Sequence, residues 1–303
     1  MNLRLNVALA VWLASSSLAS AQNSPPFPDD LVSFKPVRAE PVFSGRGTGF
    51  WDTKIRERGW ILFENNTYRM WYTGYDGTRE GIKRLGYATS PDGIQWERRG
   101  PLIDNLWVED MTVVKLKDRY LMFAEGKGDK AQLLTSSDGL AWKREGALDV
   151  RRANSKPIPP GPYGTPTVYF ENGVFNLFYE RRDQGVWLAR SRDLKVWTNV
   201  SDEPILSPGP AKHEDLMIAM NQIVKRGDWY YAYYHGTGSP TKPRDWCCCI
   251  AASRDLIHWT KYGKNPLLPV EQNKSSGILV LAGQNAKFFT MHDKVELHEV
   301  EVK

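Results

Sequence analysis

The sequence lacks several features that would place it in other classes of protein. Its only three cysteines are adjacent, at positions 247–249, which excludes a disulfide framework between distant loops and does not match the spacing of a zinc site. No apolar run beyond the N-terminus is long enough to span a membrane. Lysine and arginine are scattered, and the formal net charge is only +5, so no nucleic-acid surface is indicated. We therefore predict no cofactor, no metal site, no membrane span and no nucleic-acid partner.

The cysteines are interpreted as small apolar residues of a strand that alternates in and out of a core. A vicinal disulfide or a reactive thiol is the alternative. The five histidines are too dispersed to indicate a metal site. Aromatic side chains, by contrast, are abundant at 12%, with 12 Trp and 13 Tyr. They favour either a sheet-rich core or a site that stacks flat ligands.

The first residues are typical of an export signal. Arg4 supplies a positive start, residues 7–18 form an apolar stretch too short to span a bilayer, and Ala-Ser-Ala at 19–21 is a cleavage site. We predict a signal peptide over 1–21, a flexible leader over 22–33 and a single domain over 34–303. The protein is then expected to be secreted or periplasmic.

Four turns share the spacing S-x-D-[GL]-x-x-W and define a repeat. In each, the Asp can bond its own backbone after a short strand-like run, which predicts a tight turn between two strands. The repeats end at Trp96, Trp142, Trp197 and Trp259, about 45 to 60 residues apart, which is the scale of a propeller blade. Because these tryptophans recur in every unit, we predict that they pack between blades and do not bind ligand.

Upstream of each turn lies a hairpin whose second strand is aromatic, such as Y-R-M-W-Y at 68–72, so each unit has four strands. At the N-terminus, Phe34 lies seven residues before the proline of a P-V-F run. Two of the repeated tryptophans, Trp197 and Trp259, also lie seven residues before a proline, so the N-terminal segment is interpreted as a spare outer strand. At the C-terminus, residues 285–291 and 295–302 are interpreted as inner strands with no outer strand after them. Joining the two ends predicts an all-β, five-bladed β-propeller whose ring is closed by the N-terminal strand; an open sandwich is the alternative.

In a propeller, the segments that enter the innermost strands converge on one funnel. We expect these segments at 50–59, 106–111, 161–166, 213–222 and 280–285. The acids and aromatics that they would bring together are Asp52, Glu57, Glu109, Asp110, Glu214, Asp215, Trp51, Trp107 and Tyr163. Glycosidic bond hydrolysis needs one protonated acid, one base for water and a stacking surface for the sugar, and this set could supply all three.

The chain resembles the five-bladed propeller glycoside hydrolases, a group that includes families 32, 43, 68, 117 and 130. The resemblance covers essentially all of the expected mature chain, through the blade period, Y-R-M-W-Y-T-G at 68–74 and S-P-D-G-I-Q-W at 90–96. For families 32 and 43 it implies three acids at the starts of the first three blades. Counting back from the aromatic strands places Glu57 first and Asp110 second, with Met111 where those families have proline. The third count falls at 164–166, where the acid is missing.

As hypotheses, we assign Asp52 or Glu57 as base or nucleophile, Asp110 as the group that orients and tunes, and Glu214 or Glu180 as acid. Substrate contacts are expected from Trp51, Trp107, Glu109, Tyr163, Asp215 and His235, of which Asp215 and His235 are further candidates for the acid. Simpler roles compete with these: Asp52 as the cap of a loop, and Glu57 or Glu180 as a partner in an ion pair. Glu109 and Asp110 are adjacent, so on a strand only one of them is expected to reach the funnel.

The sequence thus predicts an exo-acting glycoside hydrolase that uses paired carboxylates on oligosaccharides. A non-catalytic carbohydrate-binding propeller is one alternative, because the third acid is missing. A phosphorolytic enzyme, as in family 130, is another. A sialidase-like enzyme is the last, because the repeated turn resembles the Asp-box.

Overall fold

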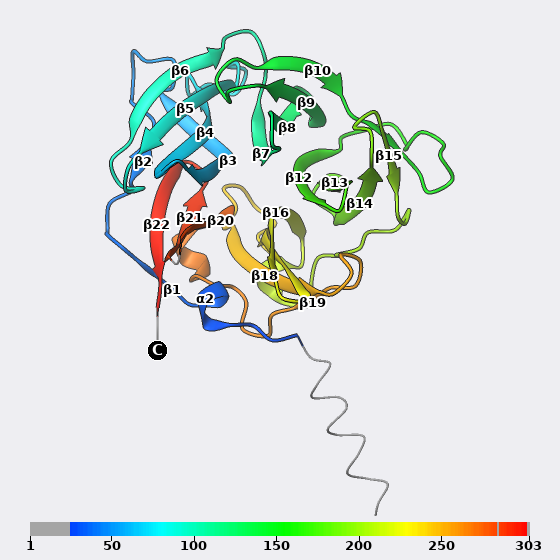
Figure 1. Cartoon of the computed structure of the whole chain (residues 1–303). Helices are drawn as coiled ribbons and strands as arrows, with labels where there is room; N and C mark the ends of the chain where they lie inside the picture. Colours follow the sequence, from blue (N-terminus) through cyan, green and yellow to red (C-terminus); the bar gives the residue numbers. More distant parts are fainter. Residues whose placement is uncertain (1–24, 284, 302–303) are drawn as a thin grey trace, which may run out of the picture.

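The computed structural model describes residues 25–283 and 285–301. In this part of the chain, five β-sheets stand around a ring (Figure 1). The α-helix described there, α2 (Asp29–Val32), is a single turn. The predicted fold class is therefore confirmed, since the chain is an all-β, five-bladed β-propeller. Among the described residues, no helix has both the length and the apolar character needed to cross a bilayer.

The first two blades each contain four antiparallel strands, which succeed one another from the ring axis outward. The first blade consists of β3 (Lys54–Glu64), β4 (Thr67–Tyr75), β5 (Arg84–Ser90) and β6 (Glu97–Ile103). The second consists of β7 (Glu109–Lys115), β8 (Tyr120–Gly126), β9 (Lys130–Ser136) and β10 (Lys143–Ala147). Because neighbouring strands run in opposite directions, the start of each inner strand lies beside the end of the second strand.

The next two blades follow the same plan. The third consists of β12 (Gly164–Glu171), β13 (Val174–Glu180), β14 (Val186–Ser191) and β15 (Val196–Asn199), with β11 (Asp149–Arg151) parallel to β15 at the outer edge. The fourth consists of β16 (Met217–Arg226), β17 (Trp229–Thr237), β18 (Cys247–Ser253) and β19 (Thr260–Lys261). Two short 3-10 turns, η1 (Lys212–Glu214) and η2 (Val270–Gln272), precede the fourth and fifth blades.

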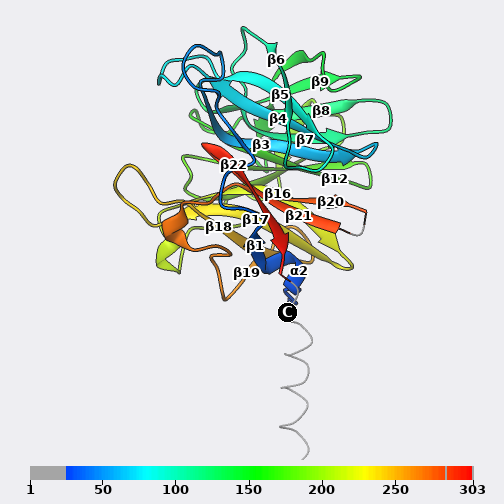
Figure 2. The ribbon, with the colours of Figure 1, turned by 90° about the vertical axis from the view of Figure 1, so that its left-hand side faces the viewer.

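The fifth blade takes its outer strand from the N-terminus. It consists of β20 (Gly277–Ala282), β21 (Asn285–Met291), β22 (Lys294–Val300) and β1 (Phe34–Pro36), and β2 (Phe43–Ser44) also pairs with β22. Phe34 stands opposite Val300, and the blue N-terminal strand lies beside the red C-terminal one in Figures 1 and 2. The predicted closure is confirmed. The expected lead-in at 280–285 is wrong by one strand, because the innermost strand of this blade is β20 and residues 285–291 form the second strand. This blade lacks the repeated turn from which the strands of the other blades were counted.

The repeated turns have the predicted chemistry. In the first, Ser90 Oγ accepts the N–H of Gly93 at 2.8 Å, and Asp92 Oδ1 accepts the N–H of Ile94 at 2.8 Å. Equivalent bonds recur in the other three turns. Trp142 packs edge-on against Trp71 of the neighbouring blade, with ring centroids 6.2 Å apart. Such aromatic contacts contribute about 0.5–1.5 kcal/mol beyond the area they bury.

The predicted leader over 22–33 differs from expectation where it is described. Leu31 is fully buried, and its carbonyl accepts the hydroxyl of Tyr233 at 2.8 Å. The hydroxyl of Tyr231 donates to the carbonyl of Pro26 at 2.6 Å. This segment is held against the fourth blade because it covers apolar surface there. The predicted signal peptide over 1–21 lies outside the described residues.

Candidate active site

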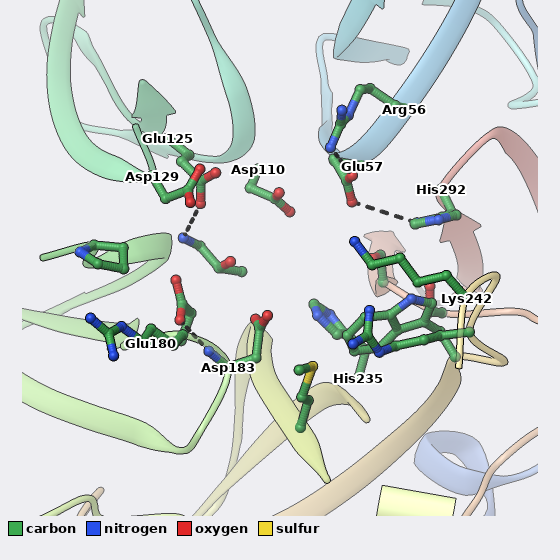
Figure 3. A pocket seen from close by; sticks show the side chains of 18 of the residues that line it. Arg56, Glu57, Asp110, Glu125, Asp129, Glu180, Asp183, His235, Lys242 and His292 are labelled. Atoms are coloured by element: carbon green, nitrogen blue, oxygen red, sulfur yellow. Dashed lines mark hydrogen bonds and ion pairs between the residues drawn. The ribbon is translucent and has the colours of Figure 1, made fainter. Parts of the chain in front are cut away.

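A cavity of about 640 Å³ lies at the centre of the ring. It is built where inner strands begin and second strands end. Figure 3 shows the acids of the second and third blades on one side, facing His235, Lys242 and His292 on the other. The ionisable residues that line the cavity are Arg56, Glu57, Asp110, Glu125, Asp129, Glu180, Arg182, Asp183, His235, Lys242, Arg244 and His292.

Three equivalent β-bulges set the geometry of the wall. The pairing register shifts near the start of β3, β7 and β12, and a residue with positive φ stands in each shift: Glu57 at 56°, Asp110 at 46° and Thr165 at 45°. A bulge turns a side chain away from its regular direction. It therefore brings Glu57 and Asp110 to the cavity, and the third position of the series carries a hydroxyl where the first two carry a carboxylate.

Carboxylates from second strands stand where the third acid is missing. The backbone N–H of Thr165 donates to Glu125 Oε2 at 2.9 Å, and that of Gly164 donates to Glu180 Oε1 at 3.0 Å. A Cβ on Gly164 would lie only 2.1 Å from Glu125 Oε2 and 2.7 Å from Glu180 Oε1. Because Gly164 has no side chain, there is room for the carboxylates of Glu125 and Glu180 at the start of the third inner strand, which itself supplies no acid.

Arg58 blocks the centre of the ring at the level of the bulges. Its guanidinium is fully buried and donates to the carbonyls of Asp110, Pro166, Met220 and Asn221 at 2.8–2.9 Å. These carbonyls belong to the second, third and fourth blades, while Arg58 itself belongs to the first. Burial lowers the pKa of Arg58 to about 10, which still leaves it charged at neutral pH. Arg58 therefore ties the inner strands of four blades together.

Glu57 and Asp110 have opposite electrostatic environments. Burial opposes the charge on Glu57, but His292 and Arg56 outweigh it and hold the pKa of Glu57 below its ordinary value. Burial and the nearby charge of Glu57 raise the pKa of Asp110 well above its ordinary value. The pKa values of the two neighbouring carboxyl groups are therefore shifted in opposite directions, which favours the ionised form of Glu57 and the protonated form of Asp110.

Three further cavity acids, Glu125, Glu180 and Asp183, are also shifted toward the protonated form. Burial and the charge of Asp110 raise the pKa of Glu125 well above its ordinary value. Burial and Asp183 raise the pKa of Glu180 to about 7, and burial and Glu57 raise that of Asp183 to about 6. Clustered carboxyl groups with raised pKa values in a cavity are typical of a functional site.

His235 is neutral in this setting, because burial and the charge of Arg58 lower its pKa to about 3. Its Nδ1 accepts the side-chain N–H of Asn221 at 2.8 Å, which places the proton on Nε2. His235 therefore offers the cavity a neutral hydrogen-bond donor.

Several predicted site residues lie elsewhere. Asp52 is fully buried outside the cavity, where it accepts from Arg46 at 2.6 Å and from Arg98 and Tyr72 at 3.0 Å each. This corrects its placement in the funnel, because Arg46 and Arg98, the latter on the outer strand β6, hold it away from the cavity. Trp51 stacks on Tyr72 beside it, with centroids 5.9 Å apart.

The lead-in to the fourth blade is also placed away from the cavity. Glu214 is buried with Lys261 3.1 Å from its Oε2, and Asp215 is exposed. Of the predicted segment 213–222, only Met217 lines the cavity. The predicted roles of Glu214 as acid and of Asp215 in binding therefore have no support in this geometry.

The remaining predicted contacts lie just outside the wall. Glu109 accepts the indole N–H of Trp107 at 2.6 Å and pairs with Arg56 at 3.0 Å. The hydroxyl of Tyr163 donates to the carbonyl of Leu148 at 3.1 Å. Glu109 and Asp110 thus face different surroundings, as their adjacency on a strand predicts.

Sequence reasoning missed Glu125, Asp129, Asp183, Arg182, Lys242, Arg244 and His292. For Glu125, a usable signal was present. In each of the first four blades, one aromatic residue of the second strand pairs with the Ser of the repeated turn. The residue five positions after that aromatic residue is Thr73 in the first blade, Glu125 in the second, Glu180 in the third and His235 in the fourth. An alignment of the second strands alone would have placed Glu125 beside Glu180 and His235.

Comparisons with known proteins agree with the fold. No protein-family model matches the chain. The chain is 27% identical over 225 residues to the 1,2-β-oligomannan phosphorylase of Thermoanaerobacter sp. strain X514, a match that covers 68% of this chain and 72% of that protein. Two solved structures share the fold. A glycosyl hydrolase from Bacteroides ovatus has a TM-score of 0.74 and 16% identity, covering 90% of this chain and 95% of the other.

The second structure is the β-1,2-mannobiose phosphorylase of Listeria innocua, with a TM-score of 0.66 and 13% identity, covering 88% of this chain and 95% of the other. The chain is therefore a five-bladed β-propeller of the architecture found in glycoside hydrolases and glycoside phosphorylases. The resemblance inferred from its sequence motifs is confirmed at the level of architecture. Its relatives include both reaction types.

Proposed function

We propose that the chain is a glycoside hydrolase that removes terminal sugars from short glycans. The observation that carries this proposal is the pair Glu57 and Asp110, which project from equivalent bulges and have pKa values shifted in opposite directions. The cavity, at about 640 Å³, is of the size that holds a small ligand, which favours a short glycan or a glycan end. Hydrolysis of a glycosidic bond requires such a pair of carboxyl groups.

In this mechanism Asp110 donates its proton to the glycosidic oxygen as the bond to the anomeric carbon breaks. Glu57 takes a proton from the water that attacks that carbon, so the products are a free sugar and a shortened alcohol. The backbone N–H of Arg58 donates to Asp110 Oδ1 at 3.3 Å, which leaves Oδ2 to carry the transferable proton. Asp110 is thereby assigned as the acid, where sequence reasoning assigned it to orient and tune.

Glu180 suits a positioning role better than the role of acid. Both of its oxygens already accept backbone N–H groups, from Gly164 at 3.0 Å and from Asp183 at 2.6 Å. Asp183 lines the cavity, and its carboxyl accepts no hydrogen bond from any described residue. We assign Asp183 and His235 to the hydroxyl groups of the bound sugar.

The test is reducing-sugar release from a glycan panel that includes β-1,2-mannobiose, measured in phosphate-free buffer. Glu57→Gln and Asp110→Asn should each lower kcat/KM by roughly 100-fold or more, the usual contribution of a general acid or base. Asp118→Asn, at an exposed position outside the cavity, is the matched control. Wild-type turnover in both cavity variants would refute the assignment. Sugar binding without any turnover in the wild type would identify a binding protein.

Phosphorolysis is a second candidate, favoured by the cations opposite the acids. Lys242, Arg244 and His292 line one side of the cavity, where they could hold a phosphate anion in place of the attacking water. The relative from Thermoanaerobacter and the one from Listeria innocua are both phosphorylases. Inorganic phosphate distinguishes the two reactions, because a phosphorylase releases a sugar 1-phosphate only when phosphate is supplied.

We also propose that the protein acts outside the cytoplasm, on the strength of the export signal at 1–21. N-terminal sequencing of the protein from its native compartment should begin at Gln22. An intact Met1 on protein recovered from the cytoplasm would contradict export.

A further inference from the structure

A second cluster of reactive side chains lies inside the fourth blade. One ligand atom each of His213, Cys247 and Cys249 lies within 4.8 Å of the others. Both cysteines are buried free thiols. None of the three residues lines the central cavity. The proposed glycosidase chemistry therefore leaves this cluster unexplained.

The cluster forms because strand alternation selects two of the three cysteines. Cys247 and Cys249 are two positions apart on β18, so they point to the same face of the sheet, and Cys248 points to the other. Cys248 packs with Phe288 of the fifth blade. His213 arrives on the same side as the pair from η1, which is remote in sequence. This is why the spacing of the cysteines alone gave no metal signature.

The distances suit a tetrahedral ion. The two sulfur atoms are 3.7 Å apart. Two thiolates that each lie about 2.3 Å from a tetrahedral zinc ion stand about 3.8 Å from one another. His213 Nε2 is buried and has no hydrogen-bond partner among the described residues. A buried nitrogen without a partner is costly, and a bound cation would remove that cost.

We propose that His213, Cys247 and Cys249 bind one thiophilic divalent metal ion, with zinc as the best match. Two thiolates and an imidazole are ligands that zinc prefers, and the two sulfur charges balance the ion. Binding releases the two thiol protons to solvent. Water completes the tetrahedron.

The bound ion would fix a loop of the cavity. The segment between β17 and β18 carries Lys242, Arg244 and Trp246 to the cavity wall, and Cys247 follows it directly. The metal would tie the end of this segment to η1. The site is structural in this proposal, and it stands whether the enzyme is a hydrolase or a phosphorylase.

The test uses the full protein, stripped with a chelator, kept reduced, and titrated with zinc alone by calorimetry. We expect one zinc per chain and a higher melting temperature. Cobalt should give a thiolate-to-metal charge-transfer band. Cys247→Ser, Cys249→Ser and His213→Ala should each weaken zinc binding by more than about 100-fold, since even outer partners of a ligand are worth 10–100-fold.

Cys248→Ser is the matched control, because it is equally buried in the same strand but faces away. It should keep full zinc binding. His213→Ala lies outside the strand, so it tests the site even where a cysteine variant fails to fold. Absence of zinc binding in the wild type, or equal loss in Cys248→Ser, would overturn the proposal. So would one free thiol in the purified protein in place of three, because that would show a disulfide between Cys247 and Cys249.

Discussion

Glu57 Oε2 lies 3.6 Å from Nδ1 of His292, so the first and fifth blades meet at the cavity through these two side chains. The seam that closes the ring is therefore also part of the site. Glu57 belongs to the first blade and His292 to the last. His292 can therefore lower the pKa of Glu57 only when the ring is closed.

Replacing His292 should shift the pH dependence of activity. Because the positive charge of His292 lowers the pKa of Glu57, His292→Gln should raise that pKa. On acidification, kcat/KM then begins to fall at a higher pH. The acidic limb of the profile therefore moves to higher pH, while the alkaline limb does not move. His258→Gln, at an exposed position on a repeated turn, is the control. An acidic limb that does not move would show that His292 leaves the charge of Glu57 unaffected.

Replacing Arg58 should destabilise the whole ring. Arg58→Met removes the guanidinium donor from four buried carbonyls and from the hydroxyl of Thr167, and only the carbonyls of Met220 and Pro166 keep a threonine hydroxyl as donor. We expect the free energy of unfolding to fall by about 3–5 kcal/mol, as when one partner of a buried polar network is removed. Denaturant unfolding measures this, with the exposed Arg119→Met as control. A loss no larger than that of the control would mean that the strands hold together without this guanidinium.

Replacing Asp52 should separate stability from catalysis. Asp52→Asn leaves Arg46 and Arg98 without their carboxylate, and both arginines are partly exposed to water. We expect a loss of about 1–3 kcal/mol of stability, with kcat/KM unchanged below the melting temperature. Thermal unfolding and steady-state kinetics on one preparation test both parts. A selective loss of kcat with normal stability would return Asp52 to the catalytic set.

Replacing Gly164 should disturb the cavity acids directly. A methyl group there would collide with the carboxylates of Glu125 and Glu180. Gly164→Ala should lower kcat/KM by about 100-fold, the effect of displacing a site group by about 1 Å, and cost about 1–3 kcal/mol of stability. Gly263→Ala is the control, since a Cβ there meets open space. Activity equal to that of the control would show that neither carboxylate position matters to turnover.

The fold was predictable because it rests on short-range chemistry. The turn at Ser90 and Asp92 is stabilised by its own backbone bonds, and the same turn recurs three more times. The alternation of side chains and the offset from each turn then determined which residues enter the ring. That count located Glu57 and Asp110, because both precede an aromatic strand by a regular distance.

The rest of the site depends on contacts between distant segments. Asp52 lies five residues from Glu57, yet its place is decided by Arg46, six residues before it, and by Arg98 of the outer strand β6. His292 was missed because the last blade has no repeated turn from which to count its strands. Neither contact leaves a local pattern in the sequence.

The sequence by itself determined the number of blades, the partner strand that closes the ring and three of the cavity acids, Glu57, Asp110 and Glu180, since periodic turns and alternating strands encode these locally. Only the tertiary structure decided which carboxyl groups share one cavity and which of them are ionised. It also decided that His213 meets two thiols. Burial and charge at a given atom depend on what every blade brings to it, and that sum exists only in the closed ring.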